Sequence, residues 1–306
     1  MLFRKSHVSM LLLLLVVMVV TPAIVHGKKS EDSKLFEKSY KEAKKVWKDY
    51  VIDDDDKIMD YSYEYIQKGT SSSNTGGQVV GTDTILYVHV RDGKVESAFP
   101  KNPKIEDFGK PPPQLALVDD MLKEIGKVLK DNKDTVNTVV FNDEYGYPES
   151  FSITYEDGTD LDIRIENMVL YTVLQRELDH HMALWDKKMR NMQDNDYKFN
   201  TIISCYCFGI DYTAPKQITV TDGAISNVTM ADGGMAYTTE GYYTIPEVFG
   251  RIQNAIDRYY YQIDVVYDTT TTYGFPTSVA LDYHVLIADD VQNIRISDFV
   301  DLSESL

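Results

Sequence analysis

The chain has 306 residues and a formal net charge of −17, because 48 acidic side chains outnumber 31 basic ones. A surface this acidic repels phosphate backbones, so we expect no nucleic-acid partner. Only two cysteines are present, which excludes a disulfide-rich scaffold and leaves the packing of apolar side chains to hold the fold together.

Residues 1–27 have the features of an export signal. Arg4 and Lys5 give a positive start, an apolar core follows at Met10–Val20, and Val25-His26-Gly27 gives a small-residue cleavage site. The apolar core is shorter than the roughly 20 residues that a membrane-spanning helix needs. We therefore expect a cleaved signal peptide, with a retained membrane anchor as the alternative. The mature chain is then expected in the extracellular space or the lumen of the secretory pathway, without stable insertion in a membrane.

An internal repeat determines the expected domain organisation. Tyr145-Gly146-Tyr147-Pro148 returns as Tyr273-Gly274-Phe275-Pro276, and each motif lies in a matching stretch of about 130 residues. We expect both motifs to be structural turns, in which the glycine adopts a backbone angle closed to other residues and the proline stiffens the entry to a strand. The repeat predicts a first module at residues 28–172 and a second at residues 173–306.

Each copy begins with a helix in which apolar side chains recur at intervals of three and four residues. An aromatic strand follows, then a hairpin with an Asp-Gly turn, then a second helix and three more strands. In copy one the expected elements are a helix at Leu35–Tyr50, strands at Tyr61–Tyr65, Ile85–Val90 and Lys94–Ala98, a helix with Leu122, Ile125 and Leu129, and strands at Val136–Phe141, Ser150–Tyr155 and Leu161–Ile165. In copy two they are a helix at Val173–Met192, strands at Tyr197–Phe199, Gln217–Val220 and Ala224–Met230, a helix with Phe249, Ile252 and Ile256, and strands at Gln262–Tyr267, Thr277–Tyr283 and Val291–Ile296.

The order of these elements predicts the fold class. Each module is expected to be α+β, with the order helix, three strands, helix, three strands. An antiparallel sheet with both helices packed on one face is the economical arrangement for such a module.

The two cysteines stand close together, in Cys205-Tyr206-Cys207. If this segment is a strand, both thiols face the same way and their α-carbons lie roughly 6.5 to 7 Å apart, at the upper limit for a disulfide. Four interpretations stay open: a structural or incidental disulfide, a labile redox couple, two thiolates of a metal site, and pairing with another chain. Copy one has Gly69 in the place of Cys205, so the fold does not require the pair.

Carboxylates gather towards the end of copy two, at Asp268, Asp282, Asp289 and Asp290. Hard cations such as calcium take six to eight oxygen ligands, and several carboxylates can supply part of such a set. The spacing matches no calcium-loop signature, so we favour turn formation and solvated strand ends. We therefore expect no cofactor. The alternative is a divalent cation bound by these carboxylates.

Two further features concern the second copy. His181 shares a helix face with Glu177, without the spacing of a zinc protease, so a surface ion pair between them is expected. Asn227-Val228-Thr229 is a glycosylation sequon. In an exported chain it makes Asn227 a candidate for N-glycosylation.

From about Trp185 to Phe299, copy two resembles an uncharacterised family of small secreted or lipoprotein domains, classed as a domain of unknown function. The matching pattern is the tryptophan helix, Tyr197-Lys198-Phe199, Ser204-Cys205-Tyr206-Cys207, Ile218-Thr219-Val220 with Asp222-Gly223, Ile245–Phe249, Tyr267-Asp268, Tyr273-Gly274-Phe275-Pro276-Thr277, Asp282 and Asp289-Asp290. Copy one departs from it, because it lacks the cysteines and has Thr154 in the place of Asp282. The resemblance implies a location and a fold, and suggests that the cysteine pair and the turn are family features, but it implies no activity.

No Gly-x-Ser-x-Gly elbow, phosphate-binding loop or dinucleotide fingerprint occurs in the sequence. The favoured hypothesis is therefore a secreted, non-catalytic binding protein whose partner is an unknown protein or small ligand. The alternative is a redox or metal site in the second module that uses Cys205 and Cys207. Features shared by the copies are expected to be scaffold, so a specific function is best sought where the copies differ.

Overall fold

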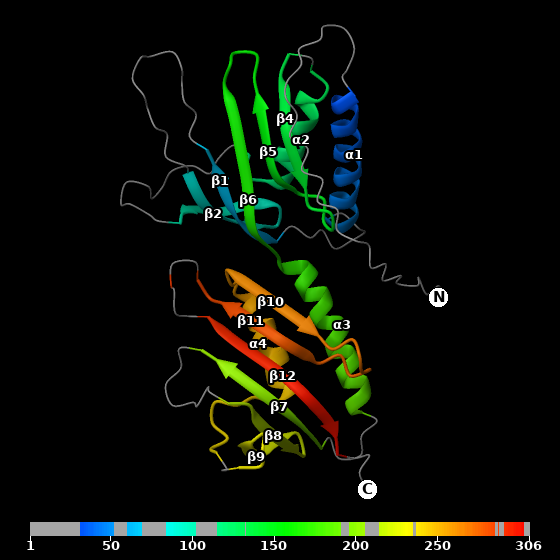
Figure 1. Ribbon diagram of the computed structural model, residues 1–306, viewed down its shortest axis with the longest axis vertical. Coiled ribbons are helices and arrows are strands. Elements are labelled where there is room, and N and C mark those ends of the chain that lie inside the picture. Colours follow the sequence, from blue (N-terminus) through cyan, green and yellow to red (C-terminus); the bar gives the residue numbers. More distant parts are fainter. Residues whose placement is uncertain are drawn as a thin grey trace.

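The computed structural model describes residues 31–51, 60–68, 84–101, 115–131, 133–190, 196–205, 214–234, 237–284, 287 and 291–302. Across these residues the chain forms two six-stranded antiparallel sheets, one in each copy of the repeat, and two helices lie against one face of each sheet (Figure 1). The α+β class and the tandem modules predicted from the sequence are thereby confirmed. None of the helices in these ranges is both long and apolar enough to cross a membrane. The expected signal peptide lies outside the described residues.

The two modules have the same order of elements. The first contains α1 (Glu31–Val51), β1 (Tyr61–Gln67), β2 (Thr84–Arg91), β3 (Lys94–Pro100), α2 (Val118–Val128), β4 (Thr135–Phe141), β5 (Pro148–Thr154) and β6 (Asp160–Leu170). The second contains α3 (Tyr171–Met189), β7 (Tyr197–Ser204), β8 (Lys216–Thr221), β9 (Ala224–Met230), α4 (Ile245–Asp257), β10 (Gln262–Tyr267), β11 (Pro276–Asp282) and β12 (Gln292–Asp301).

The sheets also share one topology. Their strand orders are β3-β2-β1-β6-β5-β4 and β10-β11-β12-β7-β8-β9, so the first and last strands of each module pair at the centre of its sheet. The Asp-Gly hairpins are confirmed in both copies. Asp92 and Gly93 have φ angles of 49° and 67°, and Asp222 and Gly223 have 53° and 76°. These left-handed angles match the twist of the paired strands that they join.

The repeat extends to the side chains of the core. Trp47 meets the ring of Tyr61 edge-on at 5.8 Å, and Trp185 meets Tyr197 in the same way at 5.4 Å. In each module the tyrosine hydroxyl then accepts a hydrogen bond from a backbone N–H at the start of the second helix. One aromatic pair thus connects the sheet to both helices. Such contacts explain why each module carries one buried tryptophan at the matching place.

The central strands continue further than the sequence pattern predicts. β6 reaches Leu170 and β12 reaches Asp301, because each passes through a bulge at a residue with positive φ, Asn167 in β6 and Asp298 in β12, both at 52°. Asn and Asp tolerate this angle better than other side chains. The bulge lets the strand resume its pairing beyond an unpaired position, and an isolated Asn or Asp gives little sequence signal of it.

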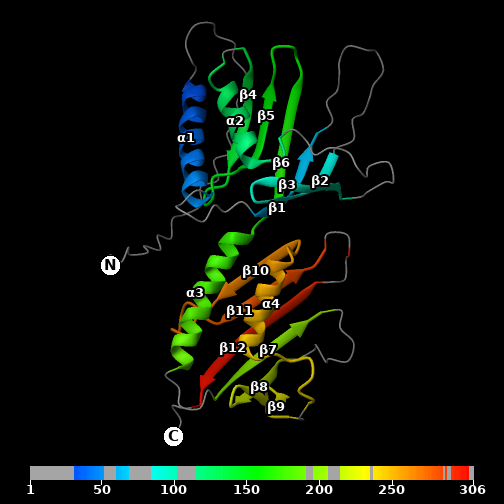
Figure 2. The same ribbon diagram turned by 180° about the vertical axis from the view of Figure 1, so that it is seen from behind.

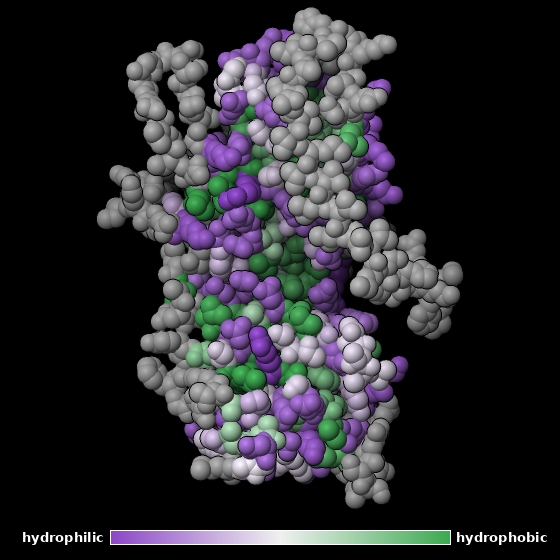
Figure 3. Space-filling model, viewed as in Figure 1, coloured by the Kyte–Doolittle hydropathy of each residue, from purple (hydrophilic) through white to green (hydrophobic). Residues whose placement is uncertain are grey.

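The two modules lie end to end, and β6 runs directly into α3 between them (Figure 2). The contact is made by Tyr259–Tyr261, which join α4 to β10. The first of these rings lies 4.5 Å from the ring of His89, and the last lies 5.4 Å from the ring of Tyr87. Within the second module, the hydroxyl of Tyr171 donates to the carbonyl of the middle tyrosine at 2.8 Å. Apolar side chains gather on the surface at the level where the modules meet (Figure 3).

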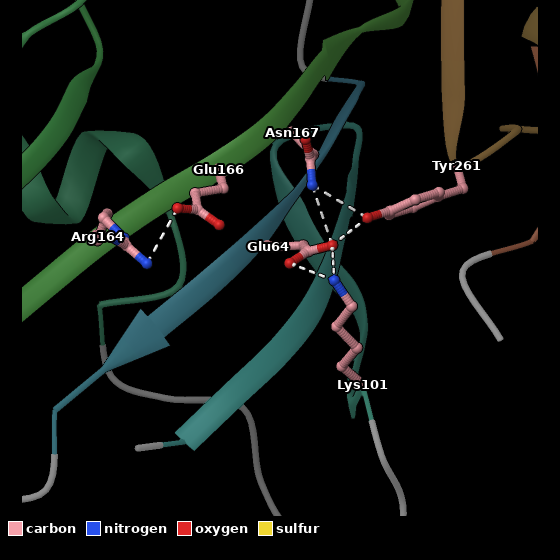
Figure 4. A network of polar contacts seen from close by, with 6 residues as sticks. All are labelled: Glu64, Lys101, Arg164, Glu166, Asn167 and Tyr261. Atoms are coloured by element: carbon pink, nitrogen blue, oxygen red, sulfur yellow. Dashed lines mark hydrogen bonds and ion pairs between the residues drawn. The ribbon is translucent and has the colours of Figure 1, made fainter.

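A buried carboxylate strengthens this contact. The side chain of Glu64, on β1, is 2% exposed. It accepts hydrogen bonds from the ammonium of Lys101 at 2.7 and 3.0 Å, from the amide of Asn167 at 3.1 Å, and from the hydroxyl of Tyr261 (Figure 4). Burial by itself raises the pKa of Glu64, but these hydrogen bonds outweigh it and hold the pKa below its ordinary value. Because Tyr261 belongs to the second module, the charged group links the two.

Candidate functional site

Cys205 lies directly after β7 and is disulfide-bonded. Cys207 lies outside the described residues. A disulfide sulfur is not a thiolate, and thiolates are the form that binds metals and attacks disulfides. The redox or metal role of the pair stays a prediction, which titration of thiols in the purified chain would test.

The carboxylates of copy two do not all meet. Asp268 follows β10 at the end where that strand meets the start of β11, and its oxygens accept hydrogen bonds from the N–H and hydroxyl groups of Thr270 and Thr271. Asp282 pairs with Gln262 at the opposite end of the same two strands. Asp289 and Asp290 lie outside the described residues. Among the described residues, no group of three or more His, Cys, Asp or Glu side chains is arranged to hold a metal ion.

Both glycines of the turn motifs have the expected positive φ, 76° at Gly146 and 70° at Gly274. In each copy the turn is closed by a backbone hydrogen bond of 2.8 Å, from Asn142 to Tyr147 and from Asp268 to Phe275. Asn142 therefore stands in the first module where Asp268 stands in the second. The matching geometry assigns Asp268 a place in the turn.

Two other predicted side chains are placed clearly. Asn227 is exposed on β9, an edge strand of the second sheet, so the sequon is accessible from solvent. The expected ion pair between Glu177 and His181 is wrong. His181 instead lies flat on the ring of Tyr267 at 3.9 Å, and its Nδ1 lies 3.1 Å from the carbonyl oxygen of Gly274. Stacking and a backbone acceptor hold this ring more firmly than an exposed carboxylate would.

A different site stands out on the first module. A hollow of about 820 Å³ opens between α1, α2 and the segment after α2. We call it the lysine groove, and its lining consists of Tyr40, Lys44, Lys123, Gly126, Lys127, Lys130, Asp131 and Lys133. Five of these eight residues are lysines and one is acidic. The local charge is therefore opposite in sign to that of the whole chain.

The inner wall of the groove depends on Tyr40 and Gly126. A Cβ atom at Gly126 would stand 2.2 Å from the hydroxyl oxygen of Tyr40, so only glycine lets this ring lie against the backbone of α2. The ring is almost completely buried, and its hydroxyl accepts a hydrogen bond from the ammonium of Lys44 at 3.1 Å. A hydroxyl both accepts and donates, so the Tyr40 hydroxyl keeps a proton that it can donate.

The lysines have weak partners or none. Lys123, Lys127 and Lys133 form ion pairs with Asp120, Glu124 and Glu156, and the three lysine side chains are 72%, 65% and 65% exposed. Exposed pairs of this kind contribute about 0 to 1 kcal/mol, so a bound anion can replace the carboxylates. The ammonium of Lys130 has no partner among the described residues.

The sequence contains a signal for this groove that is easy to miss. Lys123 and Lys127 lie four residues apart on one face of α2, Gly126 stands between them, and Lys130 follows three residues later, just beyond the end of the helix. Such a stripe normally indicates a solvated helix face. Only the contact of Gly126 with Tyr40, from a helix some 80 residues away in sequence, turns the face into a concave surface.

The family of the chain follows from a comparison with models of protein families. The model described as a family of unknown function, DUF6174, matches two tandem regions, residues 39–162 and 177–301. The chain belongs to this family. Searches of curated proteins and of solved structures found no match. The first matched region runs from within α1 to the start of β6, and the second runs from within α3 to the end of β12.

The second DUF6174 module has other side chains at the places that match the groove. With the tryptophans and the second helices aligned, Leu178 stands for Tyr40 and Met182 for Lys44, while Gln253 stands for Gly126 and Asp257 for Lys130, as the sequence shows. The side chain of Gln253 exchanges hydrogen bonds of 2.8 and 2.7 Å with Gln175 of α3, which joins the two helices. The same fold is thus built with a lysine groove in one module and with a bridge of neutral amides in the other.

Proposed function

We propose that this DUF6174 chain is a secreted, non-catalytic binding protein and that the lysine groove of its first module is its binding site. The observation that carries the proposal is the difference between the modules at one place in a shared fold. The second module forms the same sheet and helices without Tyr40, Gly126 or the lysines. Folding therefore does not require these side chains, and a binding role accounts for them.

The size and position of the groove support this role. Ligand sites are typically concave and of about 300 to 1,000 Å³, a range that includes the volume found here. Figure 1 places α1 at the right edge of the first module, where Figure 3 shows hydrophilic side chains, and no labelled element of the second module lies over α1 or α2 in Figure 1. Because one fold supports many functions, only the residues of this site point to a binding role.

The test uses a variant in which the groove takes the residues of the second module: Tyr40→Leu, Lys44→Met, Gly126→Gln and Lys130→Asp. The second module shows that these side chains are compatible with the fold. The mature chain and this closed-groove variant are screened against one library of anionic, neutral and cationic small molecules, with binding followed by amide chemical shifts. We expect compounds that bind the mature chain to lose roughly tenfold or more in affinity, about 1.4 kcal/mol, in the variant.

Two results would contradict the proposal. If the compounds bind the closed-groove variant unchanged, the site lies elsewhere. If mass spectrometry detects conversion of a bound compound by the mature chain, the protein is not purely a binding protein.

A further inference from the structure

We infer that the lysine groove binds a small anion that carries two or more phosphate or sulfate groups. This inference rests on the proposed function and specifies its ligand. Its basis is that five lysines from separate stretches of the chain line one hollow, with Lys44 on α1, three lysines on and after α2, and Lys133 beyond them. Each ammonium offers three donors and acts towards phosphate as a point charge.

The end of helix α2 does not by itself explain these lysines. Cations are favoured at a helix C-terminus, and Lys127 in the last turn together with Lys130 just beyond it fits that effect. The effect is confined to the last turn, however. Lys123 lies more than one turn before the end of α2, and Lys44 belongs to another helix. The negative end of the α2 dipole therefore does not account for Lys123 and Lys44 in the lining of the groove.

The buried wall of the groove adds a directional contact. The Tyr40 hydroxyl already accepts from Lys44, which leaves its own proton for an acceptor in the groove. An anionic oxygen is the acceptor that this pair of groups suits best, because hydrogen bonds to a charged group are about twice as strong as neutral ones. Asp131 is the single acidic group of the lining, and its carboxylate accepts from the backbone N–H of Lys133.

The rest of the chain limits the size of the ligand. Because the net charge is −17, an extended polyanion would be repelled beyond the groove, whereas a compact anion stays within the positive region. Salt screens charges over about 8 to 10 Å at physiological ionic strength, so the acidic remainder acts weakly on a ligand that is held inside. A compact, multiply charged anion therefore fits both the groove and the acidic chain.

The experiment is calorimetric titration of the mature chain with tripolyphosphate and, separately, with sucrose octasulfate. The test variant is Lys44→Gln with Lys127→Gln and Lys130→Gln. The matched control is Lys38→Gln with Lys45→Gln and Lys94→Gln, which removes the same charge from exposed lysines outside the groove. We expect the test variant to bind roughly tenfold or more weakly and the control to stay within about twofold, since only the first loses direct contacts with the anion.

The two probes separate the sources of the ligand. Binding of tripolyphosphate alone assigns a phosphate ligand, and binding of sucrose octasulfate alone assigns a sulfated one. Absence of binding by both probes, or equal weakening in the test and control variants, would overturn the inference. The single change Lys130→Gln repeats the test with minimal effect on folding. If neutral or cationic compounds lose affinity in the closed-groove variant while both anions fail to bind, the inference fails and the proposed binding site stands.

Discussion

The hydroxyl of Tyr261, in the second module, donates a hydrogen bond to the buried carboxylate of Glu64, in the first module, across 197 positions of sequence (Figure 4). The acceptor, Glu64, is charged, and the donor, Tyr261, belongs to the other module. Hydrogen bonds to charged groups contribute about 1.5 to 3 kcal/mol, and loss of the Tyr261 donor leaves the buried carboxylate with Lys101 and Asn167 alone. The contact therefore makes the stability of each module depend on the other.

The change Tyr261→Phe tests this dependence. Phenylalanine keeps the ring that packs on Tyr87 but removes the donor, so we expect the free energy of unfolding to fall by about 1 to 3 kcal/mol. Urea denaturation followed by circular dichroism measures the change. Tyr243→Phe is the matched control, because the ring of Tyr243 stacks on the guanidinium of Arg251 and phenylalanine preserves that contact. Equal effects of the two substitutions would contradict the role of the Glu64 contact.

The pH dependence of stability tests whether the charge of the Glu64 carboxylate stabilises the fold. The pKa of Glu64 is lowered in the folded chain from its ordinary value of 4.5, although burial alone would raise it. A lowered pKa contributes stability that is present above about pH 4.5 and is lost as the pH falls through the folded value. We expect Glu64→Gln to be less stable than the parent chain at pH 7, and the difference to narrow steadily below pH 4.5.

The measurement is urea denaturation at intervals from about pH 3 to pH 7, a range that brackets the ordinary glutamate pKa of 4.5. Asp268 also has a lowered pKa, because hydrogen bonds from Thr271 and Thr270 outweigh its burial, so part of the acid loss should persist in the variant. A difference between variant and parent that stays constant over this range would show that the charge of Glu64 does not stabilise the fold.

The elements of each module could be predicted because their causes are local. The helix stripes, the alternating strands and the Asp-Gly turns each depend on residues within a few positions of one another, and the repeat showed every one twice. The bulges at Asn167 and Asp298 were missed because a single residue with positive φ interrupts no pattern. The strands beyond them follow from pairing with β1 and β7, which is a long-range cause.

The sites were harder to predict, for a related reason. Asp268 was considered for a metal site because carboxylates stood near it in sequence, but its hydrogen bonds lie within its own turn, and Asp282 lies at the far end of the hairpin. The lysine groove was missed because each of its helices, taken alone, has an ordinary solvated face. Only the packing of Tyr40 on Gly126 makes one surface of the two.

The turn glycines offer a graded test of backbone conformation. Gly158, Gly274 and Gly146 all have positive φ, between 70° and 80°. Alanine in this region costs about 1 to 2 kcal/mol from the angle alone. A Cβ at Gly158 meets nothing within 4 Å, at Gly274 it stands 3.0 Å from the side chain of Leu184, and at Gly146 it stands 2.2 Å from the carbonyl oxygen of Ala43. We therefore expect alanine to destabilise least at Gly158 and most at Gly146.

Thermal or urea unfolding of the three variants measures this order. Gly158→Ala serves as the internal control, because it isolates the cost of the backbone angle. The obstacle at Gly146 is backbone of α1, which cannot move aside, whereas the one at Gly274 is a side chain with alternative rotamers. If Gly146→Ala lowered the free energy of unfolding no more than Gly158→Ala, the turn would not lie as close to the backbone of α1 as the structure places it.

Asp268 can be tested against its counterpart in the first module. Asn142 occupies the matching place and its side-chain oxygen accepts from the N–H groups of Glu144 and Tyr145, as Asp268 does from Thr270 and Thr271. Asp268→Asn keeps one acceptor oxygen and should cost less than about 1 kcal/mol, while Asp268→Ala leaves the turn donors without a partner and should cost about 1 to 3 kcal/mol. Unfolding is measured with and without calcium. A turn role predicts the same difference between the variants in both conditions, whereas a metal role predicts that calcium stabilises the parent chain and neither variant.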